Sequence, residues 1–273
     1  MRCVKLLIVL FIAMFAVPVV LAAQDENLDM SKEFPGRDKF PDVGVIELKD
    51  LYEKRKDVII VDARSSYEYE TLRIKGAINV ALSSKTYGEE LKQLREKNPE
   101  KTMVFYCNGK TCLKSYKAVR QAQFHKIDNV VAFDAGVFDW AKSFPGDAEL
   151  LGQSPINPKQ LISKGEFKKR LLAPAEFGSR VGDSTMVLDV RDLQQREAIG
   201  FFPGYERRVG LDDKKNLQKY IERAKERGKT LLIYDEVGKQ VQWLQYTLEA
   251  AGLKNYYFMD GGAKGYYDML AKN

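Results

Sequence analysis

Histidine and cysteine are scarce in this chain of 273 residues. It has one histidine, His125, and three cysteines, of which Cys107 and Cys112 share one short segment. A structural zinc site usually draws on four such side chains, and here no second cysteine pair exists while His125 falls beyond the helix expected after the pair. We therefore expect no metal site and no cofactor, and we expect His125 to mark a helix end rather than to act as a base.

A strong excess of one charge is also lacking. The formal net charge is +6, and removal of Arg2 and Lys5 would lower it by two to +4. Basic and acidic residues alternate through EKRKD (53–57) and ERAKERGK (222–229), a pattern typical of solvated helix faces. The composition therefore indicates no nucleic-acid partner.

Long apolar runs are missing after residue 23. Before that point, Arg2 and Lys5 precede an apolar run from Leu6 to Phe15, and small residues lead to Ala23. This order is typical of a secretory signal peptide over residues 1–23, which predicts a periplasmic or secreted protein. An uncleaved membrane anchor is the alternative. Cleavage would remove Cys3, leave the mature protein without stable membrane insertion, and expose a polar segment, 24–39, that we expect to be flexible.

The rest of the chain contains one framework twice. Residues 58–80, VIIVDARSSYEYETLRIKGAINV, match 185–207, TMVLDVRDLQQREAIGFFPGYER, with D-x-R at offset 127. TMVFYC (102–107) matches TLLIYD (230–235) at offset 128, and NVVAFDAG (129–136) matches NYYFMDGG (255–262) at offset 126. The first copy is therefore two residues longer near its cysteine loop.

Each copy alternates short β-branched runs with charged segments of helical spacing. This alternation predicts an α/β fold, with a parallel sheet covered by helices on both faces. Ligands of such sheets bind beyond the carboxyl ends of the strands, where the cysteine loop should lie. We expect domains at 40–150 and 160–273, joined by a linker at 151–159 that contains proline.

These landmarks resemble tandem rhodanese domains. The resemblance covers roughly residues 40–272 and rests on the D-x-R strand end, a following glycine, the strand–loop–helix unit, and a closing D-x-G-x-x-x-W/Y element. That last element comprises Asp134, Gly136 and Trp140 in the first copy and Asp260, Gly262 and Tyr266 in the second. The resemblance implies two rhodanese-like α/β domains. Asp235 stands at the position of Cys107, so the second domain should be catalytically inactive.

By this resemblance Cys107 is the catalytic residue of an exported sulfurtransferase. Its thiolate would take sulfane sulfur from a small anionic donor such as thiosulfate, polysulfide or mercaptopyruvate, and the persulfide would pass sulfur to a thiol or thioredoxin-like acceptor. Without a nearby histidine, backbone amides and lysines must activate the thiol. The active loop would comprise Asn108, Gly109, Lys110, Thr111, Cys112 and Lys114, with Asp62 and Arg64 as supporting residues.

Two departures from the family pattern leave alternatives open. The loop is longer, and Cys112 replaces the arginine that often closes it, so the preferred donor is undetermined. Cys112 could resolve a Cys107 persulfide, form a disulfide with Cys107, or simply fill space. The alternative function is therefore a polysulfide-binding or thiol redox protein that cycles the two cysteines. A cysteine phosphatase or arsenate reductase would need arginine six residues beyond the cysteine, where Leu113 stands.

Overall fold

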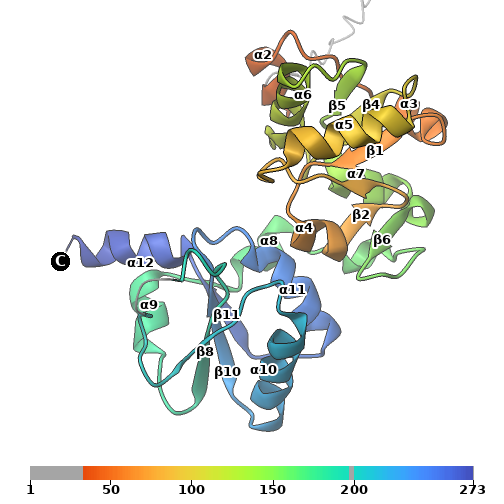
Figure 1. Ribbon diagram of the computed structural model, residues 1–273. Helices are drawn as coiled ribbons and strands as arrows, with labels where there is room; N and C mark the ends of the chain where they lie inside the picture. The colour runs from red at the N-terminus through yellow and green to blue at the C-terminus, as the bar shows by residue number, and fades with distance from the viewer. Residues whose placement is uncertain (1–32, 197–199, 273) are drawn as a thin grey trace, which may run out of the picture.

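The computed structural model describes residues 33–196 and 200–272. The predicted signal peptide and residues 24–32 lie outside the described residues, so export stays a prediction. Within the described ranges, no helix has both the length and the apolar character needed to cross a membrane. Figure 1 shows two lobes that correspond to the two sequence copies, with α4 of the first and α11 of the second where they meet.

The first lobe is built on a parallel four-stranded sheet in the order β3-β1-β4-β5. Its strands are β1 (Ile59–Asp62), β3 (Ile78–Asn79), β4 (Met103–Tyr106) and β5 (Val130–Phe133). Its helices are α2 (Pro35–Lys39), α3 (Leu48–Lys54), α4 (Ser66–Thr71), α5 (Tyr87–Lys97), α6 (Lys114–Phe124), α7 (Gly136–Ser143) and the 3₁₀ turn η1 (Pro145–Asp147). A small antiparallel pair, β2 (Leu72–Ile74) and β6 (Ala148–Leu150), stands beside them.

Alternation along the strands produces two cores, one on each face of this sheet. Val104 and Tyr106 of β4 pack with α3 and α7, whereas Met103 and Phe105 pack with α5 and α6. All four of these side chains are fully buried, as expected for a central strand of a sheet covered on both faces. The predicted α/β architecture is thus confirmed for the first copy.

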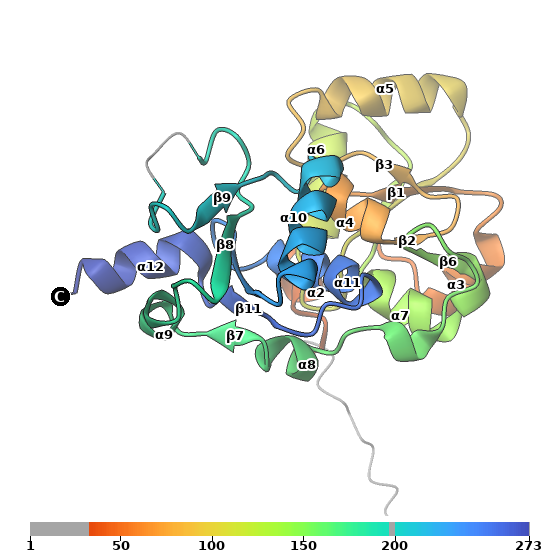
Figure 2. The same ribbon diagram turned by 90° about the horizontal axis from the view of Figure 1, so that it is seen from below.

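The second lobe repeats this plan with a five-stranded parallel sheet in the order β7-β11-β10-β8-β9. Its strands are β7 (Leu171–Leu172), β8 (Thr185–Asp189), β9 (Glu206–Arg208), β10 (Thr230–Tyr234) and β11 (Tyr256–Met259). Its helices are η2 (Pro158–Gln160), α8 (Lys164–Lys168), α9 (Pro174–Ser179), α10 (Lys214–Glu226), α11 (Val241–Ala250) and α12 (Gly262–Leu270). In Figure 2, α9 and α12 lie on one side of the sheet and α10 and α11 on the other.

Part of the segment expected to be flexible is ordered. Residues 35–39 form α2, and the guanidinium of Arg37 bonds the Asp134 carboxylate at 2.8 Å. Asp134 also accepts a 2.6 Å hydrogen bond from the Tyr116 hydroxyl. The expectation of flexibility was wrong for these residues because polarity alone does not reveal that a buried carboxylate, far along the chain, needs a cationic partner.

Candidate active site

The cysteine loop begins at the carboxyl end of the central strand β4. Cys107 directly follows Tyr106, and α6 begins at Lys114, so residues 107–113 connect a buried strand to a helix. The neighbouring strand β1 ends at Asp62, which is paired in register with Tyr106. The side chains predicted for the site therefore converge at one edge of the sheet, as expected for a parallel sheet.

Cys107 is sealed inside this edge. Its side chain has 0% exposure, and burial raises the pKa of its thiol well above the ordinary value. Its Sγ lies 3.3 Å from the carbonyl oxygen of Cys112 and 3.8 Å from the hydroxyl oxygen of Ser115. The expectation that Cys107 is an accessible thiolate is therefore wrong, because desolvation favours the neutral thiol.

Cys112 holds the position that was expected for Cys107. It is partly exposed and lines a cavity of about 710 Å³. The pKa of its thiol is lowered to about 6, chiefly by a hydrogen bond from the Cys107 side chain, and further by the backbone amides of Lys114 and Asn108 and the charge of Lys114. The loop amides and Lys114 thus form a cradle around the thiol of the second cysteine rather than the first, just before the N-terminus of α6.

Asp62 and Arg64 brace this loop from beneath. The buried Arg64 guanidinium binds both carboxylate oxygens of Asp62, at 2.9 and 2.6 Å, and also donates to the Leu72 carbonyl at 2.6 Å. Its remaining Nη1 donates to the side-chain oxygen of Asn108 at 3.1 Å. The pair therefore reaches the cysteine loop through Asn108, which it orients by a charge-assisted hydrogen bond.

Glu68 is a site residue that lies outside the predicted loop. Its carboxylate accepts hydrogen bonds from the Asn108 amide at 3.2 Å and from Lys114 at 3.3 Å. Burial raises its pKa, but the charges of Lys114 and Arg64 outweigh this and keep the pKa below the ordinary value. The signal was present in the sequence, since Ser65 and Glu68 form a capping box at the start of α4.

The two loop lysines do not present free charges. Lys110 forms ion pairs with Glu33 and, at 3.5 Å, with Asp139. Lys114 pairs with Glu68, although its charge still acts on the Cys112 thiolate. The expectation that the loop lysines activate the thiol is thus weakened for Lys110, because two carboxylates that the sequence did not place there lie beside it.

The D-x-G element packs tightly against the loop. Gly136 has a φ of +71°, and a Cβ built there would lie 2.4 Å from the backbone nitrogen of Gly109. The following amides bond the loop, from Val137 to the Cys107 carbonyl at 2.9 Å and from Phe138 to the Asn108 carbonyl at 3.4 Å. Glycine is needed at position 136 because a side chain would separate α7 from the loop.

The second domain supplies one wall of the cavity beside Cys112. Trp243 and Tyr246 of α11 line it together with Phe138 of α7 and with Leu161 and Ile162, which precede α8. The rings of Phe138 and Trp243 stack with centroids 5.4 Å apart. Trp243 also lies 5.0 Å from the Arg64 guanidinium carbon, so the second copy contacts the residue that supports the cysteine loop.

The equivalent loop of the second copy is filled by its own carboxylate. Asp235 accepts backbone hydrogen bonds from Val237, Gly238, Gln240 and Val241, the last at 3.1 Å. These amides are the counterpart of the cradle in the first copy. Asp235 already accepts from these amides, and its carboxylate offers no thiol to which sulfur could be bound.

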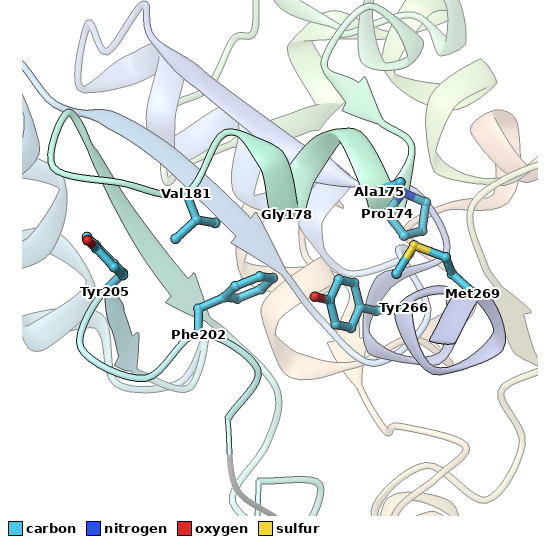
Figure 3. Close-up of a pocket in the computed structure, with 8 residues that line it drawn as sticks. All are labelled: Pro174, Ala175, Gly178, Val181, Phe202, Tyr205, Tyr266 and Met269. Carbon is cyan, nitrogen blue, oxygen red and sulfur yellow. The ribbon is translucent and has the colours of Figure 1, made fainter. Parts of the chain in front are cut away.

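A further cavity in the second domain is lined by no residue of either loop. It measures about 560 Å³ and is shown in Figure 3 between α9 and α12. Phe202 and Tyr266 face one another there with ring centroids 5.3 Å apart, and Met269 and Pro174 complete one end. Its lining contains no cysteine, histidine or carboxylate, so it offers no nucleophile.

The fold and site define a two-domain α/β protein with a cysteine loop after its central strand. Residues 45–143 and 173–269 each match the Rhodanese-like domain family, and the chain belongs to that family as a tandem protein.

Curated relatives include tRNA uridine(34) hydroxylases. The protein of Bdellovibrio bacteriovorus is 25% identical over 101 residues, covering 37% of this chain and 28% of the relative. That of Protochlamydia amoebophila is 30% identical over 125 residues, covering 44% of this chain and 36% of the relative. The chain thus spans about a third of the length of these relatives.

Solved structures show similar folds at low identity. The thiosulfate sulfurtransferase of Pseudomonas aeruginosa is 22% identical with a TM-score of 0.35, covering 85% of this chain and 45% of that one. The BH2092 protein of Bacillus halodurans is 20% identical with a TM-score of 0.37, covering 47% of this chain and 91% of that one.

Proposed function

We propose that the protein is a sulfurtransferase in which Cys112 carries the transferred sulfur. The observation that carries this proposal is the position of Cys112 on a cavity, with two backbone amides, the Cys107 thiol and Lys114 stabilising its thiolate. A thiol with a pKa of about 6 is mostly ionised at neutral pH, which makes it available as a nucleophile. Cys107 is buried beneath it and acts as a positioning residue.

The chemistry is a displacement at sulfur. The Cys112 thiolate attacks the outer sulfur of a donor such as thiosulfate, a sulfur–sulfur bond forms to Cys112, and the donor's own bond breaks to release sulfite. The resulting persulfide anion lies in the same amide cradle, which favours its negative charge. A thiol or thioredoxin-like acceptor then attacks the terminal sulfur and regenerates the Cys112 thiolate, so the cycle needs no cofactor.

Mass spectrometry of the two cysteine variants tests this assignment. Reduced protein is incubated with thiosulfate, mercaptopyruvate or polysulfide, and the loop peptide is examined for one added sulfur atom. We expect uptake in the wild type and in Cys107→Ser, and none in Cys112→Ser. Uptake that survives in Cys112→Ser but disappears in Cys107→Ser would return the role to Cys107.

Thiol redox cycling is the second candidate. The Sγ of Cys107 lies 3.3 Å from the Cys112 carbonyl oxygen, and the Cys107 thiol is the main cause of the lowered pKa of Cys112, so the two thiols belong to one short loop and influence one another. A protein that cycles these thiols would form an intramolecular disulfide on mild oxidation and would need both cysteines for activity. Loss of activity in both single variants, with no persulfide detected, would favour this function over sulfur transfer.

We also propose that this activity operates outside the cytoplasm. The proposal rests only on the order of charged, apolar and small residues over 1–23. N-terminal sequencing of the protein from expressing cells should place the first residue at position 23 or 24. Protein with an intact Met1 that is recovered only in the cytoplasmic fraction would contradict it.

A further inference from the structure

The loop of the second copy reaches the first domain through one side chain. Gln240 directly precedes α11, and its side chain extends to the start of α4 in the first domain. Its Nε2 donates to the Glu68 carboxylate at 3.4 Å, and its Oε1 lies 3.2 Å from the hydroxyl oxygen of Ser65. Gln240 therefore contacts both members of the capping box where the two domains meet.

Asp235 fixes the backbone from which this side chain extends. One oxygen of its carboxylate accepts from the amide of Gln240 at 2.5 Å and from that of Val241 at 3.1 Å. Both hydrogen bonds are charge-assisted, so they hold the start of α11 in place. The carboxylate that stands at the position of Cys107 thus orients a residue that contacts the first domain.

Glu68 connects this contact to the cysteine loop. Its Oε2 accepts from the backbone amide of Ser65 at 3.2 Å, from Lys114 at 3.3 Å and from Gln240. Its Oε1 accepts from the Asn108 amide at 3.2 Å, and Arg64 is the second cation that acts on this buried carboxylate. The donors share one negative charge, so the loss of one donor strengthens the attraction of the carboxylate for the others.

Lys114 is the cation for which Glu68 and the Cys112 thiolate compete. Its ammonium pairs with Oε2 of Glu68, and its charge also stabilises the thiolate. Each neutral donor that Oε2 receives reduces its attraction for Lys114. Without the donor from Gln240, Lys114 would lie closer to Glu68 and act less strongly on Cys112.

Resting on the proposed sulfur transfer at Cys112, we propose that Gln240 is a positioning residue for that reaction, supplied by the second domain. It occupies one position on the Glu68 carboxylate and so leaves the charge of Lys114 available to the Cys112 thiolate. The second loop therefore has a role in this reaction that needs no thiol, because Asp235 holds Gln240 and Gln240 holds Glu68.

A matched pair of variants tests the role of Gln240. Gln240→Met keeps the length of the side chain and removes its hydrogen bonds. Thr247→Val is the control, because it removes a 3.2 Å hydrogen bond between α11 and the Tyr67 hydroxyl of α4 that involves neither Glu68 nor Lys114. The pH dependence of Cys112 alkylation is measured for both variants in the reduced protein. We expect Gln240→Met to raise the midpoint by about 0.5 pH unit and Thr247→Val to leave it at the wild-type value.

A Glu68 variant shows whether the effect passes through this carboxylate. In a Glu68→Gln background, Gln240→Met should produce no further change in the midpoint, because the charge that Gln240 shares with Lys114 is absent. The proposal would be overturned by an unchanged midpoint in Gln240→Met, by an equal rise in Thr247→Val, or by a rise that persists in the Glu68→Gln background.

Sulfur uptake separates this proposal from the proposed function. Gln240→Met should take up sulfur from thiosulfate about twofold more slowly than the wild type at pH 6, where fewer of its Cys112 thiols are ionised. At pH 9 the two rates should be equal, since the thiol is ionised in both proteins, and a defect of the same size at both pH values would contradict the proposal. If the wild type takes up no sulfur, sulfur transfer is wrong, whereas the alkylation midpoints still decide whether Gln240 acts on Cys112.

Discussion

Gly136 tests whether the D-x-G element holds the cysteine loop in place. Gly136→Ala introduces a Cβ where φ is +71° and where the nitrogen of Gly109 would be only 2.4 Å away. Gly76→Ala is the matched control, because Gly76 has a φ of +80° but nothing within 4 Å of the added Cβ. Both variants carry the cost of a left-handed alanine, and only Gly136→Ala also forces two backbone segments apart.

The expected effects differ in size and in kind. The control should lower the free energy of unfolding by about 1 kcal/mol through backbone strain alone. Gly136→Ala should lower it by about 3 kcal/mol, since overpacking adds to the same strain. It should also weaken the amide bonds from Val137 and Phe138 to the loop.

Urea unfolding and the rate of Cys112 alkylation measure the two effects separately. We expect Gly136→Ala to slow alkylation at pH 7 and Gly76→Ala to leave it at the wild-type rate. If both variants lost equal stability and kept equal alkylation rates, the close approach of α7 to the loop would have no role in forming the site.

Three further predictions concern the charged groups of the two loops. Cys107→Ala should raise the pKa of the Cys112 thiol above about 6, because it removes the hydrogen bond from Cys107 that lowers this pKa most. Cys107→Ser keeps a hydroxyl donor and should raise the pKa of Cys112 less than Cys107→Ala does. The pH dependence of Cys112 alkylation measures both changes. Lys114→Met should raise the same pKa by a smaller amount, whereas Lys117→Met on the exposed face of α6 should not. Asp235→Ala should lower the free energy of unfolding, measured in urea, by about 3 kcal/mol or more, because the backbone amides that donate to the carboxylate lose their acceptor. Asp235→Asn keeps one acceptor oxygen and should lower this free energy by about half as much.

Much of the fold could be predicted because the central strands of each sheet, whose side chains form the core, are short apolar runs in the sequence. The segments 102–106 and 230–234 became β4 and β10 almost residue for residue, and the constant offset between copies fixed their equivalence. The short strands β2, β6 and β7 were missed, since two or three residues carry no periodicity that a sequence can reveal.

The site was predicted as a segment but not as a geometry. The loop 107–114, Asp62 and Arg64 do come together. However, the exposed thiol was expected to be Cys107, and the structure buries Cys107 and exposes part of Cys112. Cys107 is buried because it directly follows the buried strand β4, whereas Cys112 lies further along the loop and is partly exposed. Both are cysteines beside lysines in one loop, so the residue types alone do not show which thiol is exposed. The capping box of Glu68 marks the start of α4 but not its contact with Asn108, and Trp243 comes from the other domain, so no local spacing could place either residue beside the cysteine loop.

Peptide-resolved alkylation with iodoacetamide, followed from pH 4 to pH 10, tests the central claim most directly. We expect Cys112 in the reduced native protein to react with a midpoint near pH 6, and Cys107 to react only after unfolding. A Cys112 midpoint near the ordinary cysteine value of about 8.5, or faster modification of Cys107 in the folded protein, would contradict it.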